Sequence, residues 1–582
     1  MVRFLVLSCV TLIAGLAHAD PVRVISDTGN ADLVAAVEQA VASDADTDTV
    51  FKARRVARRS AETARAYLNS EGYFDPDISH AVEAGPPIRP LIRVEPGPRF
   101  TYGQLEISLG NSALSDDDKA ILNAALSLQP GQIVKPGDVV AQEAGLLSTL
   151  RRLGYADAKV RDRRVIGDRD AATLDITYRL TPGPRIRFGA VRFDEGVRTR
   201  RPYLERLNPL EEGALYTPGD LRDFNRRLGG TRLYRIATAR LDPDSAGAND
   251  ADDEVRDVIV TLEERERYSL TAGASFSTGE GLGLTGGLVR RNATRRGDIA
   301  SVTAVVAEQQ RAFRLDWRIP NAFAYDRGLD FSAELSNEET DAFDRDALTV
   351  AGAYEVKRSE RFAYSFGAAG EFTTEEDAFG QRDAQILSVS AAARLDRSDD
   401  VLDPRNGWRL DGRVEPAIAI GDSETQFFTA TAQASAYRPV VSERLIAAVR
   451  ARGGVVVGAD VEVLPVSRRF FAGGGGSARG FEYQSIGPER EDGTPEGGRG
   501  LVEFSAELRW QTKGALGYVA FVDAASVSSD ADLKIAEPRY GVGVGVRYKT
   551  TVGPIRFDIA TPLDRRDGED PLHIYVSIGQ AF

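Results

Sequence analysis

An arginine in a glycine-rich stretch is the residue of this chain whose chemistry can be inferred most directly. Arg479 lies just after four consecutive glycines, Gly473 to Gly476, and precedes Gly480. Its guanidinium carries five donors in a rigid planar fork, which suits paired hydrogen bonds to a carboxylate. The candidate partners lie farther along the chain, on segments that alternate like strands: Glu503, Glu507 and Asp523. These residues predict an ion pair that fastens a loop.

Residues for covalent, metal or acid–base catalysis are scarce. The single cysteine, Cys9, falls in a segment expected to be removed, which excludes cysteine catalysis, disulfides and cysteine metal sites in the mature chain. His80 and His573 stand apart, without the spacing of a metal site or a hydrolase triad. Residues 281–286 fit G-x-G-x-x-G, but they alternate as a strand and no helix follows. We therefore expect a protein that is not an enzyme and holds no cofactor or metal.

The last eleven residues, 572–582, read as a strand with two unlike faces. One face is apolar, and the other carries His573, Tyr575 and Ser577. A strand between lipid and an aqueous lumen requires this alternation. The residues that make up this terminal strand signal are Tyr575, Ile578, Gly579 and Phe582. The alternative for this segment alone is an edge strand of a soluble sandwich.

The first nineteen residues have the pattern of a secretory signal peptide. Arg3 is followed by an apolar stretch from Phe4 to Leu16 and by the small-x-small sequence Ala17-His18-Ala19. No later apolar run reaches the roughly 20 residues that a membrane-spanning helix needs. An exported chain of this kind is either soluble or a closed barrel, because closure satisfies every backbone N–H and C=O in lipid.

Residues 20–264 contain three copies of one small α+β domain. Residues 153–155 echo residues 71–73 at a spacing of 82, and Pro218-Gly-Asp220 follows Pro136-Gly-Asp138 at the same spacing. Each copy has the order strand, helix, helix, strand, strand. The expected domains are 20–98, 99–183 and 184–264. Each sheet leaves a strand edge open, which could accept a partner strand, although the domains could also serve only as spacers.

Residues 265–582 contain about sixteen alternating segments. In residues 502–510 the charged side chains occupy one face only, with apolar and aromatic side chains on the other. A closed barrel puts such an apolar face in lipid and the charged face in its lumen. The stretch near 466–500 is a long loop, and its glycine run, Gly473 to Gly476, would allow it to fold back into the lumen. The net charge of −14 argues against nucleic acid as a partner.

These features together resemble the outer-membrane protein insertase superfamily, whose repeats are called POTRA domains. Gly476-Ser-Ala-Arg-Gly-Phe481 is similar to its (V/I)RG(F/Y) loop motif, and Phe521-Val-Asp523 to its F-x-D-x-G strand motif. Residues 553–563 resemble its penultimate strand. Ala478 replaces the usual Val or Ile, and Ala525 replaces the usual Gly and leaves less room for loop packing. The fold that follows is three N-terminal POTRA domains and a 16-stranded antiparallel transmembrane β-barrel.

The resemblance implies a site as well as a fold. The loop motif, Arg479, Gly480 and Phe481, is expected to lie inside the barrel, with Asp523, Phe521, Glu503 and Glu507 as its partners. We expect Arg479 to pin this loop near a weak seam between the first strand, from about Tyr268, and the last strand. That seam could open toward lipid to expose a templating edge or to thin the bilayer.

Location and partners also follow from the resemblance. The barrel is expected in the outer membrane of a Gram-negative bacterium, with the POTRA domains in the periplasm. Three repeats favour the translocation and assembly module branch, which works with a TamB-like inner-membrane-anchored partner on client proteins such as autotransporters, or on lipids. The alternatives are the central barrel-assembly subunit, a two-partner secretion transporter, or a plain pore with periplasmic adaptor domains.

Overall fold

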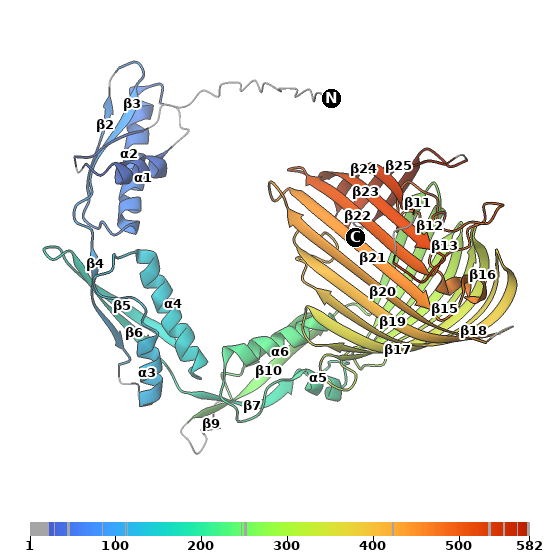
Figure 1. Ribbon diagram of the computed structural model, residues 1–582. Coiled ribbons are helices and arrows are strands. Elements are labelled where there is room, and N and C mark those ends of the chain that lie inside the picture. Colours follow the sequence, from blue (N-terminus) through green and yellow to red (C-terminus); the bar gives the residue numbers. More distant parts are fainter. Residues whose placement is uncertain are drawn as a thin grey trace. The chain divides into compact units, whose positions relative to one another are not determined.

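The computed structural model (Figure 1) describes most of the chain. The described residues are 22–27, 29–42, 47–83, 85–110, 112, 114–245, 247–248, 253–421, 424–533, 537–550, 553–566 and 568–578. The predicted signal peptide, Gly579 and Phe582 lie outside them. Two compact units are present: Met1–Arg192 with Leu210–Asp223 and Ala239–Val260, and Phe193–Pro209 with Phe224–Thr238 and Thr261–Phe582. The third repeat therefore contributes segments to both units.

The first repeat is a three-stranded sheet with two helices. Its elements are β1 (Arg23–Ile25), α1 (Ala31–Val41), α2 (Val50–Ser70), β2 (Asp77–Glu83) and β3 (Arg89–Glu95). The sheet order is β1-β3-β2, which leaves β2 at an edge. Asn30 and Thr49 cap the two helices by accepting backbone N–H bonds. The helices bury an apolar face against the sheet, where Leu68 and Ile92 meet in one core.

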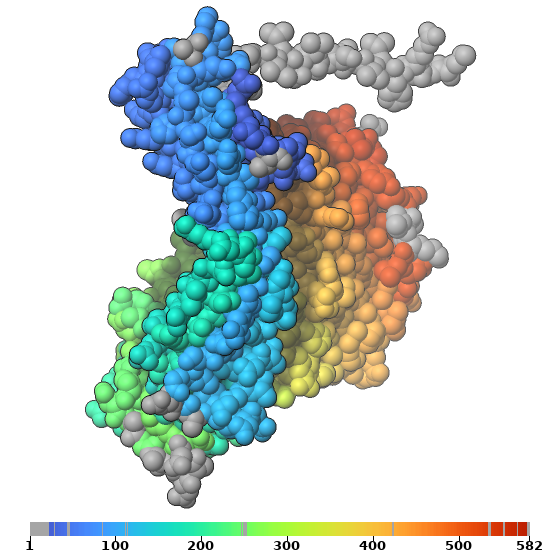
Figure 2. All heavy atoms as spheres, turned by 90° about the vertical axis from the view of Figure 1, so that its left-hand side faces the viewer, coloured from blue at the N-terminus to red at the C-terminus, as the bar shows by residue number. Residues whose placement is uncertain are grey.

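The second repeat has the same plan. Its elements are β4 (Thr101–Ser108), α3 (Asp116–Ala124), α4 (Pro136–Arg152), β5 (Lys159–Asp168) and β6 (Thr173–Thr181), in the sheet order β4-β6-β5. Tyr155 lies in its core and donates to the Asp118 carboxylate at 2.9 Å. Burial, together with that carboxylate, raises the pKa of Tyr155 to about 12. Figure 2 shows the atoms of the first two repeats in blue to cyan.

The third repeat consists of β7 (Ile186–Phe193), α5 (Arg201–Leu207), α6 (Pro218–Gly230), β8 (Tyr234–Leu241), β9 (Gly247–Ala248) and β10 (Glu254–Glu264). Within the second unit, α5 contacts two hairpin turns of the barrel. The backbone N–H of Arg200 donates to the carbonyl of Arg295 at 2.8 Å, and Arg206 donates to the carbonyl of Asn321 at 3.0 Å. No helix among the described residues is both long and apolar enough to cross a membrane.

The repeated glycines of the first two repeats have a common role after the second helix. Gly72 and Gly154 both have positive φ, +93° and +100°, and their carbonyls accept the N–H groups of Phe100 and Ile186. A left-handed residue at this point ends a helix and redirects the chain, and glycine adopts that conformation without strain. In the third repeat Arg232 takes this conformation, with φ +57°. The repeated glycine, Gly72 and Gly154, therefore marks the same kind of helix end in both repeats.

Gly154→Ala is expected to destabilise the second repeat, whereas Gly145→Ala in the same repeat is expected to stabilise it. A Cβ at Gly154 would lie 2.7 Å from a Leu215 methyl and would occupy a strained φ, which costs about 1–3 kcal/mol. A Cβ at Gly145, inside α4, meets nothing within 4 Å, so alanine gains about 1 kcal/mol of helix propensity. Hydrogen exchange of β6 amides in the full chain measures both changes. Shifts of the same sign would contradict this account.

The last part of the chain is a closed barrel of sixteen strands, as expected from the alternation (Figure 1). Its strands are β11 (Tyr268–Ser277), β12 (Gly281–Arg291), β13 (Ile299–Ala307), β14 (Gln310–Ile319), β15 (Arg327–Glu339), β16 (Phe343–Lys357), β17 (Phe362–Asp377), β18 (Gly380–Asp396), β19 (Gly407–Gly421), β20 (Glu424–Pro439), β21 (Leu445–Val457), β22 (Gly500–Gln511), β23 (Leu516–Ser528), β24 (Arg539–Thr550), β25 (Gly553–Pro562) and β26 (His573–Ile578). Each strand pairs antiparallel with its neighbours, and large apolar side chains such as Phe313, Leu387 and Val544 are exposed on the outer wall. This apolar wall is the surface that a bilayer covers.

Candidate functional site

A long segment between β21 and β22 enters the barrel and contacts its strands from the inside. This loop, residues 458–499, contains two short 3-10 turns, η1 (Val461–Val463) and η2 (Val466–Arg468). At its start, Arg468 pairs with Glu371 on β17 at 2.9 Å, and the Val466 N–H donates to Glu375 at 3.0 Å. Farther along it contacts strands β22 to β26. The loop is thus held on two separate arcs of the barrel wall.

Arg479 forms the centre of the second attachment. It is 2% exposed, and its Nε and Nη2 donate to the two oxygens of Asp523 at 2.7 and 3.0 Å. Its Nη1 lies 2.7 Å from Glu507 and 3.1 Å from Asp558. The backbone N–H of Arg479 also donates to Asp523, at 3.1 Å. A fork-to-fork pair with further carboxylates at its edge is among the strongest polar contacts available to a protein.

An aromatic ring also contacts the guanidinium of Arg479. The centre of the Arg479 guanidinium lies 3.4 Å from the centroid of Phe521, whose ring is buried beneath it. Phe521 and Asp523 are two residues apart on β23, so both point into the lumen. Stacking and ion pairing therefore fix the fork in a single orientation.

Glu503, predicted as a partner of Arg479, contacts the loop at another point. It accepts from the Ser477 hydroxyl and pairs with Arg452 at 3.3 Å. Glu503 and Glu507 share a face of β22 but lie four residues apart, or about 13 Å along a strand, which is too far for one guanidinium to reach both. The prediction that Glu503 pairs with Arg479 was therefore wrong, although Glu503 still helps to hold the same loop.

Asp558 is a partner that the sequence reasoning missed. It lies on β25, is fully buried, and is shared by Arg479, Arg547 and Arg556. Its position on the charged face of an alternating segment was the signal that could have identified it. Asp523 differs from Asp558 because Arg479 is the one cation paired with it among the described residues. The loop arginine therefore neutralises a buried wall carboxylate that has no second cation there.

Gly480 and Phe481 bring the loop against the last strand. The N–H of Gly480 donates to the hydroxyl of Tyr575 at 3.1 Å, and that hydroxyl donates to the carbonyl of Phe481 at 3.2 Å. Gly480 has φ +97°, and a Cβ there would lie 3.0 Å from the Thr561 carbonyl group, so glycine is required. Tyr575, predicted only as part of the terminal strand signal, thus also fastens the loop. Ile578 from the same signal lies on the exposed face.

The two departures from the family motif pack without difficulty. Ala478 is fully buried, and Ala525 is 2% exposed. Both belong to one apolar cluster with Phe470, Phe481 and Ile486 of the loop. The methyl group of Ala525 therefore fills space between wall and loop, where the sequence had suggested crowding.

Tyr575→Phe is expected to loosen the loop while leaving the barrel closed. The substitution leaves the buried N–H of Gly480 and the carbonyl of Phe481 without this partner, which costs about 1–3 kcal/mol. Limited proteolysis of the loop in the folded protein should therefore become faster. The matched control is Tyr540→Phe, because Tyr540 is exposed on the outer wall. Equal cleavage rates for the two variants would show that the hydroxyl bridge does not hold the loop.

The seam between the first and last strands is short. The described pairing of β11 with β26 comprises two residue pairs, Phe276 with Val576 and Ser277 with Tyr575. The neighbouring ladder of β11 with β12 has ten pairs. Since Tyr575 belongs to the seam and also bonds the loop, the loop and the seam are directly connected through one side chain.

The geometry of the site offers the fastening of a loop and the pairing of strands. Among the described residues, no group of three or more His, Cys, Asp or Glu side chains is placed to hold a metal ion. What the site can do is hold a loop in the lumen by buried ion pairs and expose a weakly paired strand edge beside it.

Comparison with known proteins defines the class. A model of the Omp85 superfamily domain matches residues 292–582, and a model of the surface antigen variable number repeat, or POTRA, matches residues 100–183. The chain belongs to the Omp85 superfamily. It is an outer-membrane protein of a Gram-negative bacterium, with its POTRA domains in the periplasm.

Particular relatives are assembly factors. The outer membrane protein assembly factor BamA of Nitratidesulfovibrio vulgaris is 25% identical over 590 residues, covering 96% of this chain and 72% of that protein. BamA of Neisseria meningitidis serogroup B is 22% identical, covering 84% of this chain and 68% of that protein. The crystal structure of Haemophilus ducreyi BamA lacking POTRA domains 1–3 has a TM-score of 0.68 at 18% identity, covers 82% of this chain and all of that one, and shares the fold. The family and these relatives support a role in assembly or transport.

Proposed function

We propose that this protein inserts client proteins into the outer membrane at the seam between β11 and β26. The observation that carries the proposal is the short seam, which has two residue pairs among the described residues beside a β11–β12 ladder of ten pairs. An edge with unpaired N–H and C=O groups can template an incoming strand. The inserted strand would gain hydrogen bonds to those backbone groups of β11 that have no partner among the described residues of β26, so folding of the client supplies the free energy.

The lengths of the barrel strands also favour insertion at the β11–β26 seam. Strands β11 to β14, next to the seam, have 9 to 11 residues, and β26 has six described residues in its strand. Strands β16 to β20, away from it, have 15 to 17. A shorter apolar wall thins the adjacent bilayer and lowers the barrier to insertion there. The same thinning would ease the movement of phospholipids, a second activity of this surface.

We also propose the branch of the superfamily to which this chain belongs. Three N-terminal sheets, with the orders β1-β3-β2, β4-β6-β5 and β7-β10-β8, support the translocation and assembly module, in which this chain would be the TamA-like subunit. Its partner would be a TamB-like inner-membrane-anchored protein. The second candidate is the central assembly factor, which the BamA relatives favour.

The experiment that separates these branches is crosslinking in cells through the first repeat, with a photoreactive residue at edge strand β2. Recovery of one very large inner-membrane-anchored protein supports the TamA-like assignment. Recovery of several small outer-membrane lipoproteins supports the central assembly factor. Recovery of a single secreted protein would contradict both and indicate a dedicated secretion transporter.

A plain pore is a third candidate function, and the loop inside the lumen argues against it. The lumen contains the loop, attached through Arg468 on one arc and Arg479 on another. We therefore expect low conductance from the intact protein in planar bilayers and a clear increase after deletion of residues 470–490. High conductance of the intact protein would favour the pore.

A further inference from the structure

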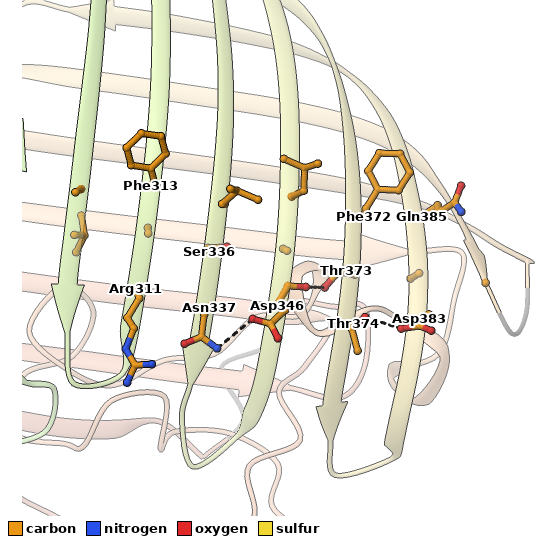
Figure 3. A pocket seen from close by; sticks show the side chains of 18 of the residues that line it. Arg311, Phe313, Ser336, Asn337, Asp346, Phe372, Thr373, Thr374, Asp383 and Gln385 are labelled. Carbon is orange, nitrogen blue, oxygen red and sulfur yellow. Dashed lines mark hydrogen bonds between the residues drawn. The ribbon is translucent and has the colours of Figure 1, made fainter.

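Two surfaces of the described chain have no part in the proposed insertion mechanism. One is a groove of about 840 Å³ on the outer wall of the barrel, over strands β13 to β19 (Figure 3). Its charged side chains carry both signs, and two of them, Asp346 and Asp383, accept hydrogen bonds from Asn337 and Thr374 on neighbouring strands. The other surface lies on α2 of the first repeat, where almost all the charges are positive. An excess of one sign is the feature that selects a partner of the opposite sign.

Helix α2 separates its apolar and its cationic residues onto two sides. Small and apolar side chains such as Ala57, Ala64 and Leu68 are buried, and the helix contacts strands β2 and β3 of the sheet (Figure 1). The exposed side carries an arginine band that consists of Arg54, Arg55, Arg58 and Arg59. With 3.6 residues per turn, these four positions fall on one side of the helix over two turns. The band is therefore one continuous cationic surface.

The four arginines of this band have no acidic partner in the described part of the chain. All four are exposed, and none forms an ion pair or a side-chain hydrogen bond with another described residue. Lys52, just before them, is by contrast paired with Asp48 at 2.9 Å. The band contains two i, i+4 pairs of arginines, and like charges at this spacing destabilise a helix. An anionic partner would relieve that repulsion.

The equivalent helices of the other two repeats do not share this charge. Helix α2 contains six basic residues and one acidic residue, a net charge of +5. Helix α4 contains two of each kind, and α6 contains three basic and two acidic residues. The chain as a whole has a net charge of −14. The cationic surface is therefore specific to the first repeat and is not required by the fold of the domain.

An exposed aromatic side chain accompanies the arginine band. In the first turn of α2, Phe51 is 79% exposed and Val50 is 46% exposed. Phe51 lies three residues before Arg54 and seven before Arg58, so its ring is on the same side of the helix as the band. Cations beside an exposed aromatic ring are typical of helices that lie on an anionic bilayer. A bilayer offers phosphates to the arginines and an apolar layer to the ring at the same time.

We propose that this side of α2 docks the first repeat on the periplasmic surface of a bilayer that contains anionic phospholipid, such as phosphatidylglycerol. The arginine band contacts the lipid phosphates, and Phe51 enters the head-group layer. A zwitterionic bilayer lacks the negative surface potential that attracts a polybasic segment, so it binds this surface more weakly. This docking is a role of the first repeat beyond client insertion at the seam.

The test measures vesicle binding by the full-length protein. The barrel is held in nanodiscs of phosphatidylcholine, which are mixed with vesicles of phosphatidylcholine alone or of phosphatidylcholine and phosphatidylglycerol in equal amounts. Co-flotation should show binding to the vesicles that contain phosphatidylglycerol, and high salt should weaken it. One basic residue near an anionic surface strengthens binding about fivefold, so Arg55→Gln/Arg58→Gln should weaken binding about 25-fold.

The matched control is Arg161→Gln/Arg164→Gln, which removes the same charge from exposed positions on β5 of the second repeat. It should bind like the unmodified protein, and circular dichroism should show that both double variants are folded. Phe51→Ser should reduce binding while leaving every charge in place. Equal binding to the two kinds of vesicle, or equal effects of the two double variants, would overturn the proposal. Tighter binding to soluble polyglutamate than to the vesicles would also overturn it and indicate an acidic protein partner.

Discussion

Arg479→Ala is expected to leave a closed barrel whose loop is released and whose client assembly is lost. The substitution removes the cation of Asp523 and one cation each from Glu507 and Asp558, all buried. Breaking a buried ion pair costs about 3–5 kcal/mol, because the remaining charge has no compensation. At 3 kcal/mol the equilibrium between docked and released loop changes by about a hundredfold.

Two measurements check this prediction together. Protease cleavage between residues 470 and 490 should become fast in Arg479→Ala, and insertion of a client barrel into vesicles should fall close to background. Arg490→Ala is the matched control, since Arg490 lies on the exposed part of the same loop and its side chain donates to the carbonyl of Ala378 in the β17–β18 turn. Full client insertion by Arg479→Ala would show that the docked loop is not part of the insertion mechanism.

The double variant Arg479→Ala/Asp523→Ala separates stability from function. Removing both partners eliminates the uncompensated charge, so stability should recover relative to Arg479→Ala alone. Client insertion should not recover, because Glu507 and Asp558 still lack the loop guanidinium. Recovery of both properties would mean that Arg479 acts only through the charge of Asp523.

Locking the seam by a disulfide is the second change with a large expected effect. Phe276 and Val576 are directly opposed across β11 and β26, at a Cβ separation that suits a disulfide with small adjustments. The chain offers a clean background, because its one cysteine is Cys9. Phe276→Cys/Val576→Cys should abolish client insertion when oxidised, and a reductant should restore it.

The control for this lock places the same bond elsewhere in the wall. Leu284 and Val306 are opposed across β12 and β13, and both are exposed on the outer face. Leu284→Cys/Val306→Cys should therefore oxidise equally well and leave insertion intact. Inhibition by both disulfides, or by neither, would contradict a mechanism in which the seam alone opens.

The fold could be predicted from the sequence because two regular patterns run through the chain. One is the repeat at a spacing of 82 residues, and the other is the alternation of apolar and polar residues in the barrel strands. Alternation of apolar and charged residues predicted sixteen strands, and the barrel has sixteen. Alternation also placed Glu507 and Asp523 on the inward face, where Arg479 contacts them. The error over Glu503 arose because a shared face was treated as a shared contact, although residues four apart on a strand are about 13 Å from each other.

Other parts of the site could not be deduced from periodicity. The hydroxyl of Tyr575 meets Gly480 from a position 95 residues later, and no local pattern reports such a contact. The described pairs of the seam, Phe276 with Val576 and Ser277 with Tyr575, depend on the register of β26 against β11 across the closure.

The measurement that tests the central claim most directly is photocrosslinking of a client during insertion. A photoreactive residue at Leu270 on β11, exposed on the outer face next to the seam, should crosslink to the terminal strand of a client barrel. The same probe at Val389 on β18, which is also exposed on the outer face but lies far along the wall, should not. Crosslinks at both positions, or at Val389 alone, would contradict insertion at the β11–β26 seam.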